Sequence, residues 1–127
     1  MLGCGKLRGK DELVAEKDAK RVKIRALNDE FRRSMNPSLG RCVMTQGVAK
    51  LPELERIAVV QKARLFDDFN EENDPHGEHD FGIIKLRGES LYFKIDYYDK
   101  TLEYGSEDSS DPEKTTRVMT LMLACEY

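Results

Sequence analysis

The chain has 127 residues, 35% of them charged, and a formal net charge of −3. This length is typical of one domain with its own core, and an apolar share of 39% excludes wholesale disorder. No apolar run approaches the roughly 18 residues of a membrane span, and the first ten residues lack an apolar stretch of signal-peptide length. We therefore expect a cytoplasmic protein with a flexible basic tail over residues 1–10 and a single domain over residues 11–127.

The first element predicted is a helix from Asp11 to Ser34. This segment is rich in Lys, Arg, Glu and Ala, which are good helix formers. Its apolar residues recur at the spacing of one helical face: Ile24, Leu27, Phe31 and Met35. Pro37 ends the helix, because proline disfavours the helical conformation in the residue before it. A short strand is then predicted at Arg41–Gln46.

A second helix is predicted from Pro52 to about Phe69. Proline suits the first turn of a helix, and apolar residues are spread nearly all round the helix that would follow. A helix that is apolar on most sides is buried on most sides. We therefore expect this helix to be the central packing element.

A β-hairpin is the clearest signal in the chain. The segments EHDFGIIKL and ESLYFKIDYY alternate in polarity on either side of Arg87-Gly88, which suits a two-residue turn. This turn places Ile84 opposite Leu91, and both residues then lie with Phe93 on the core face of the hairpin. A slip of one residue would exchange the two faces.

The last third of the chain is predicted to end in a helix. A short strand at residues 101–104 is possible, and Asp111-Pro112 is a good helix opening. The helix would run over about Pro112–Cys125. The expected order is α-β-α-β-β-(β)-α, with a small antiparallel sheet packed by helices. This mixture without βαβ regularity indicates an α+β fold.

The charges are distributed unevenly along the chain. Residues 1–60 carry +5 and residues 61–127 carry −8, and seven carboxylates lie between Phe66 and Gly82. Such clusters are usually solvated loops. Alternatively, they face solvent as one patch that binds a basic protein surface. The residues proposed to bind the partner are Asp67, Asp68, Glu71, Glu72, Asp74 and Glu78.

The two histidines of this segment raise the possibility of a metal site. Zinc or manganese could use imidazoles and a carboxylate, with His79, Glu78 and Asp96 as the candidate ligands. The sequence H-x-E-H-D matches no established ligand spacing. We therefore expect neither a metal nor another cofactor.

Acid–base catalysis is the second chemical possibility. The hairpin register would place His79 beside Asp96, and a histidine held by a carboxylate can act as a general base. Lys94 and Arg117 would be its electrostatic partners. The chain contains no nucleophile elbow and no phosphate-binding glycine loop, so an enzyme is the less favoured interpretation.

Four segments together resemble a known family. RALNDEFRRS, FDDFNEENDPHGEHDFG, KIDYYD and TTRVMTLMLACEY resemble, in this order, a bacterial family of small proteins catalogued as domain of unknown function 3768. The resemblance runs from about residue 22 to the end. The family usually has Tyr where this chain has His76, and Glu where it has Cys125. No functional residues can be carried over from it.

The resemblance implies a genetic context rather than an activity. Genes of this family tend to lie on plasmids and integrative elements, among genes of conjugation and counter-defence. We therefore expect a small binding protein of bacterial mobile elements, with a counter-defence role (anti-CRISPR or anti-restriction) exerted through its acidic surface. The expected partner is a protein with a basic surface, such as a nucleic-acid-binding effector. Direct binding to nucleic acid or membrane is not expected, and the oligomeric state is left open.

Overall fold

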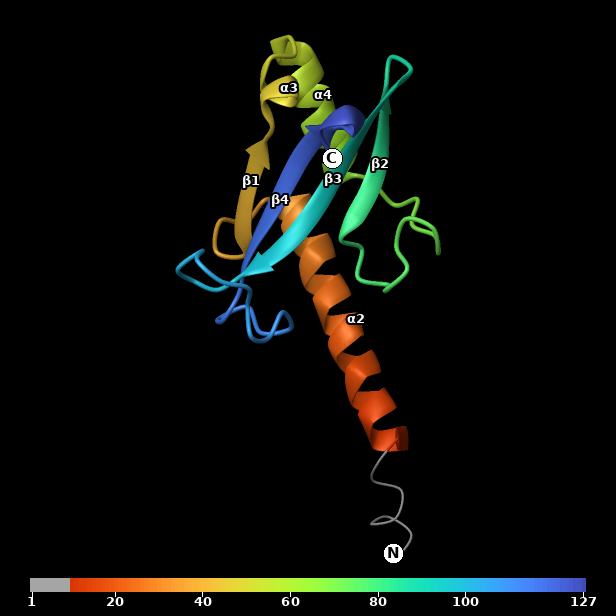
Figure 1. Cartoon of the computed structure of the whole chain (residues 1–127), viewed down its shortest axis with the longest axis vertical. Helices are drawn as coiled ribbons and strands as arrows, with labels where there is room; N and C mark the ends of the chain where they lie inside the picture. Colours follow the sequence, from red (N-terminus) through yellow and green to blue (C-terminus); the bar gives the residue numbers. More distant parts are fainter. Residues whose placement is uncertain (1–9) are drawn as a thin grey trace, which may run out of the picture.

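The computed structural model describes residues 10–127 and contains a four-stranded mixed sheet in the order β1-β4-β3-β2 (Figure 1). The α+β class is confirmed. Residues 1–9 of the predicted tail lie outside the described part, and Lys10 begins the first helix. The elements in chain order are α2 (Lys10–Ser34), β1 (Gly40–Met44), α3 (Gln46–Ala49), α4 (Glu53–Arg64), β2 (Phe81–Leu86), β3 (Glu89–Tyr98), β4 (Thr116–Leu123) and the short 3-10 helix η1 (Ala124–Glu126).

The predicted hairpin and its register are confirmed. Ile84 lies opposite Leu91, and both are buried together with Phe93. Arg87 and Gly88 form the turn with φ values of 53° and 82°. Two positive φ values are characteristic of the turn type whose twist matches that of the flanking strands.

The second helix differs from its prediction in length and in burial. α4 ends at Arg64 rather than near Phe69, and the chain leaves the helical path there. Leu54 is 80% exposed and Ile57 51% exposed. The helix lies across one face of the sheet (Figure 1), so only one of its sides can be covered. It is therefore not the central packing element.

The predicted last helix is wrong, because residues 116–123 form β4, a central strand of the sheet. β4 pairs antiparallel with β3 and parallel with β1, so the sheet is mixed rather than antiparallel. Arg117, Met119 and Leu121 alternate onto the covered face and are fully buried. The predicted strand at residues 101–104 is a turn, with a single bridge from Tyr98 to Gly105.

The sheet has one covered face and one open face. α2 and α4 lie on the same side of it (Figure 1), and their buried side chains join those of the sheet in one core. The N-terminal half of α2 extends beyond the sheet. On the other face, the rings of Phe81, Tyr92 and Tyr127 pack with centroids 5.1 to 5.7 Å apart. No helix over residues 10–127 has both the length and the apolar character to cross a membrane.

Candidate functional site

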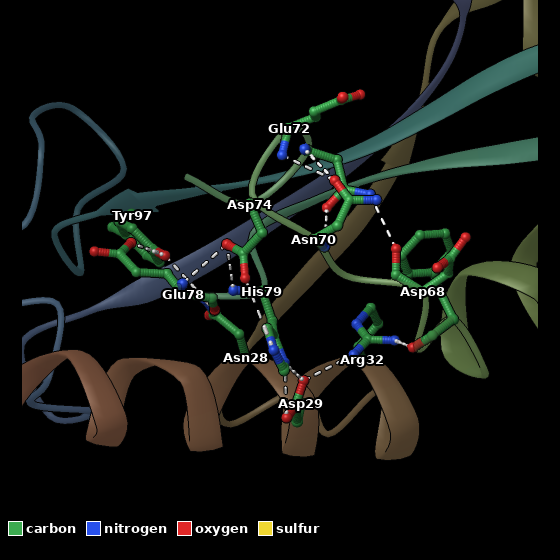
Figure 2. Close-up of polar contacts among 12 residues, drawn as sticks. Asn28, Asp29, Arg32, Asp68, Asn70, Glu72, Asp74, Glu78, His79 and Tyr97 are labelled. Carbon is green, nitrogen blue, oxygen red and sulfur yellow. Dashed lines mark hydrogen bonds and ion pairs between the residues drawn. The ribbon is translucent and has the colours of Figure 1, made fainter. Parts of the chain in front are cut away.

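The acidic segment between α4 and β2 forms a loop that two asparagines hold in shape. Asn70 Oδ1 accepts hydrogen bonds from the backbone N–H groups of Glu72 (2.9 Å) and Asn73 (3.0 Å). Asn73 Nδ2 donates to the carbonyl oxygen of Asp68 at 2.9 Å. These are turns in which an asparagine side chain replaces a backbone acceptor. Figure 2 shows that neutral side chains shape this part of the loop.

The outer carboxylates of the loop take no part in this scaffold. All four are exposed, and none forms an ion pair with another side chain of the described chain. We call this group the outer acidic loop; it consists of Asp67, Asp68, Glu71 and Glu72.

The inner carboxylates of the same segment are structural. Asp74 is buried, and its Oδ1 accepts the backbone N–H groups of Glu78 and His79, both at 3.0 Å. Glu78 is half-buried and accepts a hydrogen bond from the Tyr97 hydroxyl at 2.7 Å. The prediction of one solvent-facing patch is therefore wrong for Asp74, and Glu78 is already engaged within the fold.

His79 lies beside α2 rather than beside Asp96. Its Nδ1 is 2.9 Å from Asp29 Oδ1, its Nε2 is 3.8 Å from a carboxylate oxygen of Asp74, and its ring stacks on Phe69 at 3.8 Å. The predicted His79–Asp96 pair is wrong for a backbone reason. His79 has φ 57° and precedes β2, so the strand alternation does not extend to it. Asp96 instead pairs with Lys94 at 3.0 Å.

Arg117 is fully buried on the covered face of the sheet. Its Nε donates to Asn28 Oδ1 at 2.6 Å, and its Nη2 donates to the carbonyl oxygen of Ser109 at 2.6 Å. Burial lowers the pKa of Arg117. Residues at even and odd positions of β3 face opposite sides of the sheet. Lys94 and Asp96 therefore lie on the open face, whereas Arg117 lies on the covered face. The four catalytic candidates therefore do not form one cleft.

A buried polar network joins α2 to the hairpin and to the inner part of the loop (Figure 2). Asn28 Nδ2 donates to the carbonyl oxygen of Glu78 (2.9 Å) and to the Tyr97 hydroxyl (2.8 Å). Burial raises the pKa of Tyr97, so its hydroxyl stays protonated and can donate to Glu78. The members of this inner polar network are Asn28, Asp29, Arg32, Asp74, Glu78, His79, Tyr97 and Arg117.

Arg32 connects this network to the end of α4. Its Nη1 donates to the carbonyl oxygens of Ala63 (3.0 Å) and Phe66 (2.7 Å), and its Nη2 donates to Asp29 Oδ1 at 2.8 Å. Carbonyl groups at a helix end lack partners within the helix, so this guanidinium completes the end of α4. Burial lowers the pKa of Arg32.

Sequence reasoning missed the α2 members of the network. Asn28 and Arg32 are four residues apart, so they lie on one face of the helix. They flank Phe31, which the apolar periodicity had assigned to the core. A polar pair beside an apolar helical stripe was therefore the available signal. Its partners in the loop, some 50 residues away in the chain, could not be read from the spacing.

The metal candidates do not come together. Over residues 10–127, no group of three or more His, Cys, Asp or Glu side chains is arranged to hold a metal ion. His79 and Glu78 belong to the inner polar network, whereas Asp96 is paired with Lys94 on the open face of the sheet.

These features define a class: a small α+β protein whose mixed sheet is covered on one face, with a buried polar network beneath an acidic loop. The chain belongs to the family described as Protein of unknown function (DUF3768), whose model matches residues 44–126. No curated protein and no solved structure matches the chain. The match confirms the family resemblance from Met44, the last residue of β1, onward, whereas the likeness of RALNDEFRRS in α2 lies outside the matched residues.

Proposed function

We propose that this protein binds a partner protein through the outer acidic loop. The observation that carries the proposal is the contrast within one segment. The inner carboxylates have partners in the fold, whereas Asp67, Asp68, Glu71 and Glu72 are exposed and form no ion pair within the described chain. Four like charges on one loop repel each other, and a cationic surface would offset that repulsion.

The shape of the loop supports this role. Asn70 and Asn73 hold its backbone through neutral contacts, so the carboxylates are held on a preorganised segment. Preorganisation reduces the ordering cost of binding. A charged surface of this kind mainly accelerates association and makes it sensitive to salt.

The proposed partner is a nucleic-acid-binding effector of host defence. A groove that attracts phosphate groups also attracts carboxylates, because both respond to the same positive field. The family resemblance adds the context of bacterial mobile elements, in which an anti-CRISPR or anti-restriction inhibitor acting in the cytoplasm is the corresponding role.

The test compares two variants with the same change in net charge. In the test variant, Asp67 and Asp68 become Asn while Glu71 and Glu72 become Gln. In the control, four exposed carboxylates elsewhere become Gln: Glu53, Glu89, Glu103 and Glu113.

Affinity capture from the native host identifies the partner, and its association rate with each purified variant is then measured at two ionic strengths. We expect the test variant to associate at least about tenfold more slowly at low salt, with most of the salt dependence lost. The control variant should keep the wild-type association rate and its salt dependence. Equal losses in the two variants would show that only net charge matters. No loss in either would show that the outer acidic loop is a solvated turn.

A further inference from the structure

β2 forms one edge of the sheet, and half of its backbone groups have no partner within the described residues 10–127. The N–H of Ile95 donates to the carbonyl oxygen of Asp80 at 2.8 Å, which makes residues 80 and 95 a hydrogen-bonded pair. In an antiparallel ladder, bonded and non-bonded pairs alternate. The backbone groups of Phe81, Ile83 and Lys85 therefore point outward, and none of them bonds to another part of residues 10–127.

The surface on both sides of this edge is hollowed. On the helix side, an open groove of about 340 Å³ is lined in part by Leu65, Phe66 and Ile83. On the open side of the sheet, a second hollow of about 270 Å³ lies between β2 and the acidic segment. It is lined by Asn70, Glu72, Asn73, Phe81 and Ile83. The edge thus combines unpaired backbone groups with room for side chains.

We propose that β2 pairs with β2 of a second copy of this chain, antiparallel and about a twofold axis at Ile83. In this register Ile83 lies opposite its own copy, and Phe81 lies opposite Lys85 of the second copy. The three residues that pair with the second copy are the same three whose backbone groups point outward. The three residue pairs exchange about six hydrogen bonds and join the two sheets into one. Such an interface is closed, because the same surface is used by both copies.

The charges favour this register. Lys85 of one copy lies over the hollow beside Phe81 of the other, where Glu72 forms part of the wall. Over residues 10–127, Lys85 donates only to the Ser90 hydroxyl (2.7 Å), and Glu72 forms no ion pair. A lysine on an edge strand normally opposes pairing. Here Glu72 of the opposing copy supplies a carboxylate that offsets the charge of the lysine. The twofold axis repeats this pair, so it forms once in each half of the interface.

The other edge of the sheet lacks this complementarity. On β1 the outward backbone groups belong to Gly40, Cys42 and Met44, because Thr45 donates to Leu121 and Arg117 donates to Leu39 on the inner side. A twofold axis at Cys42 would bring no opposite charges together, since Arg41 is the single charged residue of that strand. β1 therefore supplies a matched control.

The proposal is tested on the purified full-length chain, without any partner, by sedimentation velocity over a wide range of protein concentration. The wild type should show a concentration-dependent dimer. Ile83→Lys places two like charges on the twofold axis and should raise the dimer dissociation constant at least about tenfold. Val43→Lys makes the same change on β1, at a site of matched exposure (42% against 41%), and should leave the constant unchanged.

A charge exchange tests the register independently of any effect on folding. Lys85→Glu and Glu72→Lys, both at exposed positions, should each weaken the dimer, and the double variant should restore it because the pair is re-formed with its signs reversed. A wild type that stays monomeric overturns the proposal. So does a dimer weakened by Val43→Lys instead of Ile83→Lys, or a double variant as weak as the single ones. Because no partner is present, failure of this test leaves the proposed function of the outer acidic loop unaffected.

Discussion

Glu72 and Asp74 lie two residues apart in the same acidic segment and have opposite environments. Glu72 is exposed on the outer acidic loop, whereas Asp74 is buried and accepts two backbone N–H groups. The difference arises from what each side chain can reach. An ionised carboxylate is buried only where donors compensate it, and Asp74 is within reach of the backbone N–H groups of Glu78 and His79. Chemical type alone therefore does not separate a buried structural carboxylate from an exposed one.

The two regions also differ in how they depend on the rest of the fold. The outer acidic loop is shaped by local contacts between residues 68 and 73. The inner polar network joins segments that are 50 to 89 residues apart in the chain. Changes in the network should therefore lower the free energy of unfolding, whereas changes in the loop should leave it nearly unchanged.

The largest expected effect follows removal of the buried guanidinium. Arg32→Met removes the donors to Ala63 and Phe66 and leaves Asp29 without its cation. Breaking a buried ion pair by removing one partner costs about 3–5 kcal/mol. The free energy of unfolding is measured by urea denaturation.

The neighbouring exposed arginine is the control for this change. Arg33→Met should alter the free energy of unfolding by no more than about 0.5 kcal/mol, because Arg33 is exposed. Equal effects of the two substitutions would contradict the structural role of the network.

An intermediate effect is expected from the comparison of two aspartates. Asp74→Ala leaves the N–H groups of Glu78 and His79 without their acceptor and should cost about 1–3 kcal/mol. Asp68→Ala, on the outer acidic loop, should change stability by no more than about 0.5 kcal/mol. Thermal and urea unfolding of both variants measure the difference. A cost at Asp68 as large as that at Asp74 would remove the distinction between the two regions.

The smallest expected effect depends on pH. Burial, with a further contribution from the charge of Glu78, raises the pKa of Asp80 from 3.8 to about 6. The folded state therefore binds this proton more tightly than the unfolded chain, and stability falls as pH rises through this window. Because Asp80 is partly exposed, we expect Asp80→Asn to be more stable than wild type by only about 1 kcal/mol at pH 7.

The pH dependence of that difference is the decisive measurement. The gap between Asp80→Asn and wild type should close by about pH 4, where Asp80 is protonated in the folded state. The contributions of the other titrating groups to the pH dependence of stability cancel, because both proteins contain the same groups. A gap that is the same at both pH values would show that the substitution acts through packing rather than through the charge of Asp80.

Several elements could be predicted from the sequence because their causes are local. α2 follows from helix propensity and apolar spacing. Pro37 locates its end to within a few residues, although the helix already stops at Ser34, before Met35 with its φ of 55°. The hairpin register follows from alternation around Arg87-Gly88. The exposure of Glu71 and Glu72 follows from a run of polar residues beyond the predicted helix, whereas Asp67 and Asp68 had been assigned to that helix. In each case the deciding interactions lie within a few residues of one another.

The tertiary structure decided what depends on distant partners. Residues 116–123 became β4 because β1 and β3 offer their backbone groups on both sides, and such pairing outweighs a short helical pattern. His79 was placed against Asp29 rather than Asp96 by its own backbone and by α2. Arg117 was buried with its Nε bonded to Asn28, which lies 89 residues away in the chain. The sequence by itself determined α2, the hairpin register and the distribution of charge along the chain. Packing determined the conformation of residues 116–123 and which polar groups became interior, because both depend on partners far away in the chain.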